Sequence, residues 1–84
     1  DAQFVAEILA HDEQSGLTEL DVKNKIRLGD ELELATPGGT ERFELTEMRD
    51  MEGNPLDEAP GGGWRVRIAL PTAPGDMGLL ARLV

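Results

Sequence analysis

Apolar and polar residues alternate with a period of two along most of this chain, a pattern typical of β-strands with one buried face. Residues 4–9 begin the pattern, and it is clearest in ELEL (residues 31–34) and in WRVRIAL (residues 64–70). No segment keeps the helical period of 3.6 for three turns. The sequence therefore predicts a series of short strands and no long helix.

Polar segments that contain glycine or proline separate the expected strands about every ten residues. They are HDEQSG (11–16), TPGG (36–39), MEGNP (51–55) and PGGG (60–63). Met48 breaks the parity of Phe43 and Leu45, which indicates a bulge near Glu47. The final MGLLARLV fits either a strand or a short helical turn. Because short strands avoid free edges by closure, we expect an all-β fold: a small antiparallel β-barrel of six or seven strands, similar to translation-factor-type barrels.

Length and composition exclude several classes of protein. The 84 residues make a single domain, 1–84, with one modest core. There is no cysteine and one histidine, so thiolate chemistry and a histidine-rich metal site are excluded within this chain. No apolar run reaches the roughly 20 residues of a membrane span. The chain starts at Asp1 and leads directly into a strand pattern, so we expect a domain cut from a longer cytoplasmic protein with no membrane partner.

A short basic stretch interrupts an acidic chain. Eight basic and 17 acidic residues give a net charge of −9, which disfavours non-specific binding of nucleic acid. In VKNKIR, however, Lys23, Lys25 and Arg27 lie two residues apart and would project from one face of an extended segment. They could contact phosphate, from RNA or another anion. Alternatively they are solvated and pair with neighbours such as Glu19 and Asp21.

A second basic region carries the only tryptophan of the chain. Trp64, Arg65 and Arg67 open the WRVRIAL segment, and no acid occurs between Ala59 and Gly75. An exposed Trp64 beside the arginines could stack on a base. The alternative is a core position, because Trp64 has the same parity as the apolar residues that follow it. An RNA site is favoured if the two basic regions adjoin in space.

No catalytic constellation is visible, so we expect no catalytic residue and no metal ligand in this chain. The glycine-rich PGGGW lacks the Lys-Ser or Lys-Thr and the following helix of a phosphate-binding loop, which favours a hairpin loop. Ser15, the only serine, and His11 lie in a polar turn with no further signature of a nucleophile. Acidic pairs occur, but nothing predicts a cleft between facing carboxylates.

Two long segments resemble a known family. VKNKIRLGDELELATPGG and MRDMEGNPLDEAPGGGWRVRI, after the opening FVAEIL, are similar to the C-terminal domain of the peptidase U32 family, the collagenase-like proteases. The resemblance spans essentially the whole chain. It implies a parent protein that is a peptidase, hence a hydrolase, or takes part in tRNA or ribosomal RNA hydroxylation. It also implies that the chemistry, with an iron–sulfur cluster as cofactor, belongs to a preceding catalytic domain.

Two functions follow as hypotheses. In the first, the chain is a non-catalytic accessory domain from the C-terminus of a U32-type protein and helps to position tRNA or another RNA. In the second, it is a protein-interaction or oligomerisation barrel that docks on its own catalytic domain, with an acidic face of Glu31, Glu33, Glu41 and Glu44 meeting a basic partner surface. An exposed apolar patch around Met48, Met51 and Met77 would favour this second hypothesis. A free-standing protease is disfavoured by either hypothesis.

Overall fold

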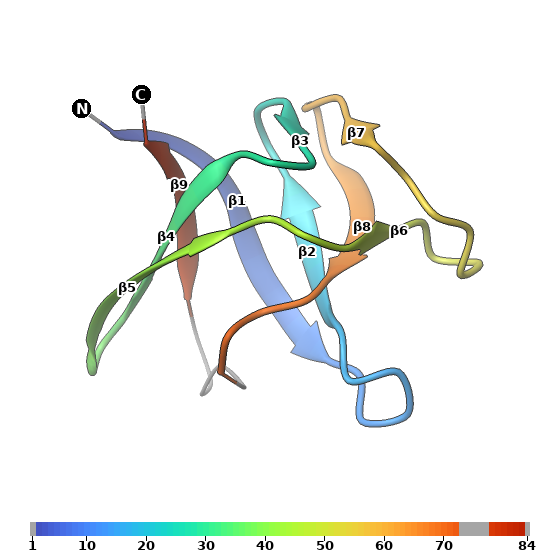
Figure 1. The fold of residues 1–84 in the computed structure, drawn as a ribbon, viewed down its shortest axis with the longest axis horizontal. Coiled ribbons are helices and arrows are strands. Elements are labelled where there is room, and N and C mark those ends of the chain that lie inside the picture. Colours follow the sequence, from blue (N-terminus) through green and yellow to red (C-terminus); the bar gives the residue numbers. More distant parts are fainter. Residues whose placement is uncertain (1, 73–77, 84) are drawn as a thin grey trace.

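A computed structural model describes residues 2–72 and 78–83 of the chain, and the described part is built from β-strands without a helix (Figure 1). The strands are β1 (Ala2–His11), β2 (Thr18–Val22), β3 (Ile26–Arg27), β4 (Glu31–Thr36), β5 (Gly39–Glu44), β6 (Met48–Arg49), β7 (Glu58–Ala59), β8 (Trp64–Ile68) and β9 (Leu79–Leu83). The predicted all-β class is confirmed. Three strands have only two residues, too few for an alternating pattern, and this is why fewer strands were predicted.

Seven strands form one antiparallel sheet in the order β5-β4-β9-β1-β2-β8-β6, and β3 pairs with β7 in a separate ribbon. The C-terminal segment is a strand, because β9 pairs with both β1 and β4. The sheet curves around the core (Figure 1). It is not closed into a barrel, because its two edge strands, β5 and β6, are not paired with each other in the described structure.

The chain itself bridges the open side of the sheet. β5 leads through residues 45–47 directly into β6, which lies at the opposite edge. Within this bridge, Leu45 donates its N–H to the carbonyl of Asp30 and accepts from the N–H of Gly29, both at 2.9 Å. Glu47 accepts from the N–H of Ala69 at 3.2 Å. The expected bulge near Glu47 is therefore a break between two strands, and covalent continuity takes the place of strand pairing at this edge.

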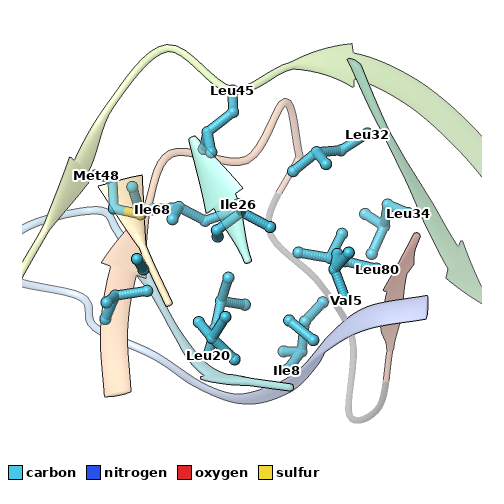
Figure 2. Packing of buried hydrophobic residues seen from close by; sticks show 14 residues of the cluster. Val5, Ile8, Leu20, Ile26, Leu32, Leu34, Leu45, Met48, Ile68 and Leu80 are labelled. Atoms are coloured by element: carbon cyan, nitrogen blue, oxygen red, sulfur yellow. The ribbon is translucent and has the colours of Figure 1, made fainter. Parts of the chain in front are cut away.

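A single hydrophobic core lies inside the curved sheet (Figure 2). Figure 2 shows Leu45 pointing from the bridge toward side chains of the sheet and of the β3 ribbon. The fully buried large apolar side chains are Val5, Leu20, Val22, Ile26, Leu32, Leu45, Met48, Val66, Ile68 and Leu80. Because these residues come from every part of the described chain, the sheet and the ribbon share one core.

The turn at Asp50 supplies a pH-dependent contribution to stability. The Asp50 carboxylate accepts hydrogen bonds from the backbone N–H groups of Asn54 and Glu52, both at 2.9 Å, and from the Asn54 side-chain amide at 3.1 Å. The N–H and then the side chain of Asn54 are the main groups that lower the pKa of Asp50 from its ordinary 3.8. A depressed pKa stabilises the fold above pH 3.8, and the contribution is lost as the pH falls through the folded-state value.

We expect an NMR titration of the Asp50 carboxyl to give a midpoint below 3.8, the ordinary value. Asn54→Ala removes one donor and should move this pKa back toward the ordinary value, while the backbone donors still hold it down. A midpoint at or above 3.8 in the unsubstituted chain would contradict this description of the turn.

Candidate nucleic-acid interface

The two basic regions adjoin at one end of the sheet. β2 ends at Val22 directly opposite Trp64, the first residue of β8, and the next pair is Asp21 with Arg65. Gly62 donates its N–H to the carbonyl of Lys23 at 3.2 Å. The ribbon of β3 and β7 lies at the same end (Figure 1). The spatial condition that favours an RNA site is therefore met for Lys23, Trp64 and Arg65.

Lys25 and Arg27 share one carboxylate. Lys25 Nζ lies 3.4 Å from Glu58 Oε2, and Arg27 Nη2 lies 3.2 Å from Glu58 Oε1. Arg27 and Glu58 are directly opposite each other in the β3–β7 ribbon, and all three side chains are about half exposed. The carboxylate of Glu58 is therefore the shared ion-pair partner of both cations on this ribbon.

Lys23 pairs with different acids from Lys25 and Arg27, the other two cations of the predicted basic stretch. Its Nζ lies 2.8 Å from Asp21 Oδ2 and 3.9 Å from Glu7 Oε1. The hydrogen bond to Asp21 is the main cause that raises the pKa of Lys23. The expected pairing with Asp21 is thus present. Lys23, just after β2, is therefore paired separately from Lys25 and Arg27, which share Glu58 at the β3–β7 ribbon.

The two arginines of β8 point away from the core and each faces an acid. Arg65 Nη1 lies 3.3 Å from Glu19 Oε2, so the expected involvement of Glu19 is also found, although with Arg65. Arg67 Nη1 lies 4.0 Å from Asp12 Oδ2 and is directly opposite Arg49 of β6. Arg67 is therefore one step farther from the end where the other predicted residues meet.

Trp64 is not a core residue, and the expectation based on its parity is wrong. Half of its surface is exposed (50%), although Val22 directly opposite is fully buried. Trp64 is the first residue of β8, and there the strand extends past the end of the core. Strand alternation places its side chain on the face opposite that of Arg65. An exposed aromatic ring thus lies at the end of the sheet where the basic regions meet.

We call this region the basic end and define it by Lys23, Lys25, Arg27, Trp64 and Arg65. Each of the eight basic residues of the chain lies within 4.0 Å of a described carboxylate, and eight different acids serve as partners. The chain has 17 acids, so nine acids remain beyond these eight partners, which matches the net charge of −9. Three of these, Glu31, Glu41 and Glu44, lie on the β4–β5 hairpin. Charge is thus balanced at the basic end and unbalanced on the hairpin.

The glycine-rich loop is part of the framework of this end. Gly62 and Gly63 donate their N–H groups to the carbonyls of Lys23 and Val22, at 3.2 and 2.8 Å. A Cβ added at Gly61 would lie 2.2 Å from the Lys23 carbonyl oxygen, so only glycine fits. Because two of its amides already bond to protein, the loop fixes the position of Lys23 and does not form a phosphate cradle.

Arg82 is a contributor to this end that the sequence reasoning missed. Its guanidinium donates to the carbonyl of Lys25 at 3.0 Å and to the Gln3 side chain, and lies 3.8 Å from Asp30 Oδ2. It is opposite Leu32 and has the parity of the buried Leu80, which places it on the inner face where β9 runs past the core. The sequence did contain a signal for this role: Arg82 has the inward parity of Leu80 but lies near the end of its strand, where a charged side chain can reach past the core.

The surfaces of the docking hypothesis are only partly present. Met48 is buried and Met51 exposed, so Met48 cannot belong to a surface patch, and Met77 lies outside the described residues. Glu31 faces Glu44 across β4 and β5, and Glu33 pairs with Arg42 at 3.5 Å. Glu41 is opposite the buried Leu34, so it lies on the inner face of β5, whereas Glu44 lies on the outer face, because side chains alternate along a strand. The four glutamates therefore do not form one acidic face.

The remaining candidates do not form a reactive pair. Ser15 Oγ donates to Asp12 Oδ2 at 2.5 Å, whereas His11 Nδ1 lies 3.1 Å from Thr18 Oγ1. An iron–sulfur cluster finds no thiolate here, because the sequence has no cysteine. Over the ranges 2–72 and 78–83, no helix is long and apolar enough to cross a membrane.

Known proteins resemble this chain in both sequence and fold. Two proteins called tRNA hydroxylation protein P match 69 residues, 82% of this chain: that of Escherichia coli K12 at 39% identity and that of Haemophilus influenzae Rd at 36%. The match spans 15% of the length of each. The crystal structure of the C-terminal domain of a U32-family protein from Geobacillus thermoleovorans has a TM-score of 0.87 at 22% identity, covering 98% of this chain and 93% of that one.

The family profile described as the peptidase family U32 C-terminal domain matches residues 1–82, nearly the full length of the sequence. The fold is shared with the Geobacillus domain over nearly the whole of both chains. The chain belongs to the family of peptidase U32 C-terminal domains.

Proposed function

We propose that this chain is the non-catalytic C-terminal accessory domain of a cytoplasmic RNA-hydroxylation protein of the U32 family. In this proposal it helps to position tRNA for a preceding catalytic domain, which carries the chemistry and the iron–sulfur cluster. The names of the two tRNA hydroxylation relatives support tRNA as the substrate. The chain supplies binding and orientation only.

The observation that carries the proposal is the clustering of cations and an exposed tryptophan at the basic end. Lys25 and Arg27 share the single carboxylate of Glu58, and Trp64 lies half exposed at the same end. Exposed ion pairs are each worth about 0–1 kcal/mol, so a phosphodiester can replace Glu58 as their partner. An aromatic face nearby can stack an unpaired base.

Charge distribution limits where a polyanion can approach. The surplus acids of the β4–β5 hairpin, Glu31, Glu41 and Glu44, repel phosphate. The four cations of the basic end are paired with four acids, Glu7, Glu19, Asp21 and Glu58, so these ion pairs leave no such surplus there. A tRNA would therefore contact this end and avoid the hairpin.

Arg27→Glu is expected to weaken binding of tRNA to the chain about tenfold and to lower the slope of log K against log salt by about one, because one phosphate contact is lost. The matched control is Arg42→Glu. Arg42 is also an exposed arginine paired with a glutamate across two strands, but it lies on the acidic hairpin. Fluorescence of Trp64, the only tryptophan, measures binding without a label.

The control shares the general change in charge, so it should weaken binding less than about threefold through long-range repulsion. Equal losses for Arg27→Glu and Arg42→Glu would mean that the basic end is simply solvated. Failure of the unsubstituted chain to bind tRNA at low salt would also overturn the proposal.

A further inference from the structure

The outer face of β9 is apolar, unlike the outer faces of β2 and β8 and most of that of β4. Strand alternation places Leu79, Ala81 and Leu83 outward, on the face opposite to the buried Leu80. At equivalent positions β2 carries Glu19 and Asp21, β4 carries Glu31 and Glu33, and β8 carries Arg65 and Arg67. Antiparallel sheets that face water normally show polar residues outside. β9 is therefore an exception to this pattern.

Neighbouring strands extend this apolar surface on both sides. Phe4 of β1 is directly opposite Ala81, and Ala35 of β4 is directly opposite Leu79. Phe4 and Leu79 are 43% and 51% exposed, large fractions for side chains of this size. We call this surface the β9 face and define it by Phe4, Ala35, Leu79, Ala81 and Leu83.

A hollow and a charged rim complete the β9 face. The hollow, of about 380 Å³, opens beside Leu79 and is lined mainly by the apolar atoms of Ile8, Ala35, Pro37 and Gly78. Ion pairs flank the face on both sides, Glu7 with Lys23 and Glu33 with Arg42. An apolar centre with a polar rim is the usual anatomy of a protein–protein interface.

β9 cannot recruit a partner by strand addition, because β1 and β4 already occupy both of its hydrogen-bonding edges. A partner must therefore pack its side chains onto the β9 face. Bulky apolar side chains suit this face, and one of them can fill the hollow.

The position of the N-terminal strand identifies the occupant. Ala2, at the start of β1, is directly opposite Leu83 at the edge of the β9 face. The chain belongs to a family of C-terminal domains, and its match spans 15% of the length of its tRNA hydroxylation relatives. Polypeptide that precedes Ala2 is thus delivered to this face at high effective concentration. We propose that the β9 face docks against an apolar surface of the preceding part of the same polypeptide.

A single introduced thiol tests this proposal, because the chain has no cysteine of its own. Leu79→Cys is made in the 84-residue chain and in the full-length protein, and mass spectrometry follows the rate of alkylation at that position. We expect alkylation to be at least tenfold slower in the full-length protein. The control is Thr40→Cys, an exposed position on β5, which should react at similar rates in both.

A second substitution tests whether the β9 face itself causes the protection. Phe4→Asp in the full-length protein should restore alkylation at position 79 to the rate of the 84-residue chain. Equal alkylation rates in the 84-residue chain and the full-length protein overturn the proposal. The proposal is also overturned if alkylation at position 79 in the 84-residue chain becomes slower as the protein concentration rises. That result would show that two copies of the chain associate through the β9 face. Neither result depends on tRNA, so failure here leaves the proposed RNA contact intact.

Discussion

Leu45→Ala is expected to lower the free energy of unfolding by about 2–5 kcal/mol, the range for truncation of a buried leucine that leaves a cavity. Leu45 is fully buried and lies in the bridge that crosses the open side of the sheet. Its backbone also bonds to Gly29 and Asp30. Because small domains have a total stability of about 5 kcal/mol upward, this loss approaches the whole for a chain of this size.

Urea unfolding followed by far-ultraviolet circular dichroism measures this effect. Leu79→Ala is the matched control, since Leu79 is half exposed and its truncation should cost less than about 1 kcal/mol. A cost for Leu45→Ala no greater than that of the control would show that the bridge is not part of the core.

Gly61→Ala should have the second largest effect, a loss of about 3 kcal/mol, at the upper end of the usual cost of overpacking. The added Cβ would lie 2.2 Å from the Lys23 carbonyl oxygen, 2.7 Å from its carbon and 2.8 Å from Asn24 Cα. These are backbone atoms, so no side-chain rotation relieves the clash. The loop must move away, which also breaks its hydrogen bonds to Val22 and Lys23.

Gly38→Ala is the control for this substitution. Gly38 has no left-handed φ, and its added Cβ would approach nothing nearer than Thr36 Oγ1 at 3.7 Å, an ordinary contact. Urea unfolding should show a change of less than about 1 kcal/mol for this control. Similar losses for the two variants would contradict the described packing of the glycine loop on β2.

The sequence predicted those features of the fold that depend on local pattern. Alternation in ELEL gave the faces of β4 correctly, with Leu32 and Leu34 buried, and TPGG marked the turn between β4 and β5. The two-residue strands escaped prediction because a period cannot be recognised in two residues. Closure was wrongly expected for the main sheet, because a continuous chain can bridge two edges without pairing them.

The candidate site depended on information that is not local. Parity indicated which face Trp64 belongs to, but not that β8 extends past the core at that end. Lys25 and Arg27 meet Glu58 only because β3 pairs with β7, more than 30 residues away in sequence. Arg82 reaches Lys25 from the far end of the chain. Such contacts follow from register and curvature, which a single sequence does not state.

The central claim is that the basic end of this domain contacts tRNA, and NMR mapping of the contact tests it most directly. Unlabelled tRNA is titrated into the ¹⁵N-labelled 84-residue chain. The account predicts shift changes concentrated at Lys23, Lys25, Arg27 and the indole N–H of Trp64, with little change on the β4–β5 hairpin. Changes centred on that hairpin, or no changes at low salt with tRNA in excess, would contradict it.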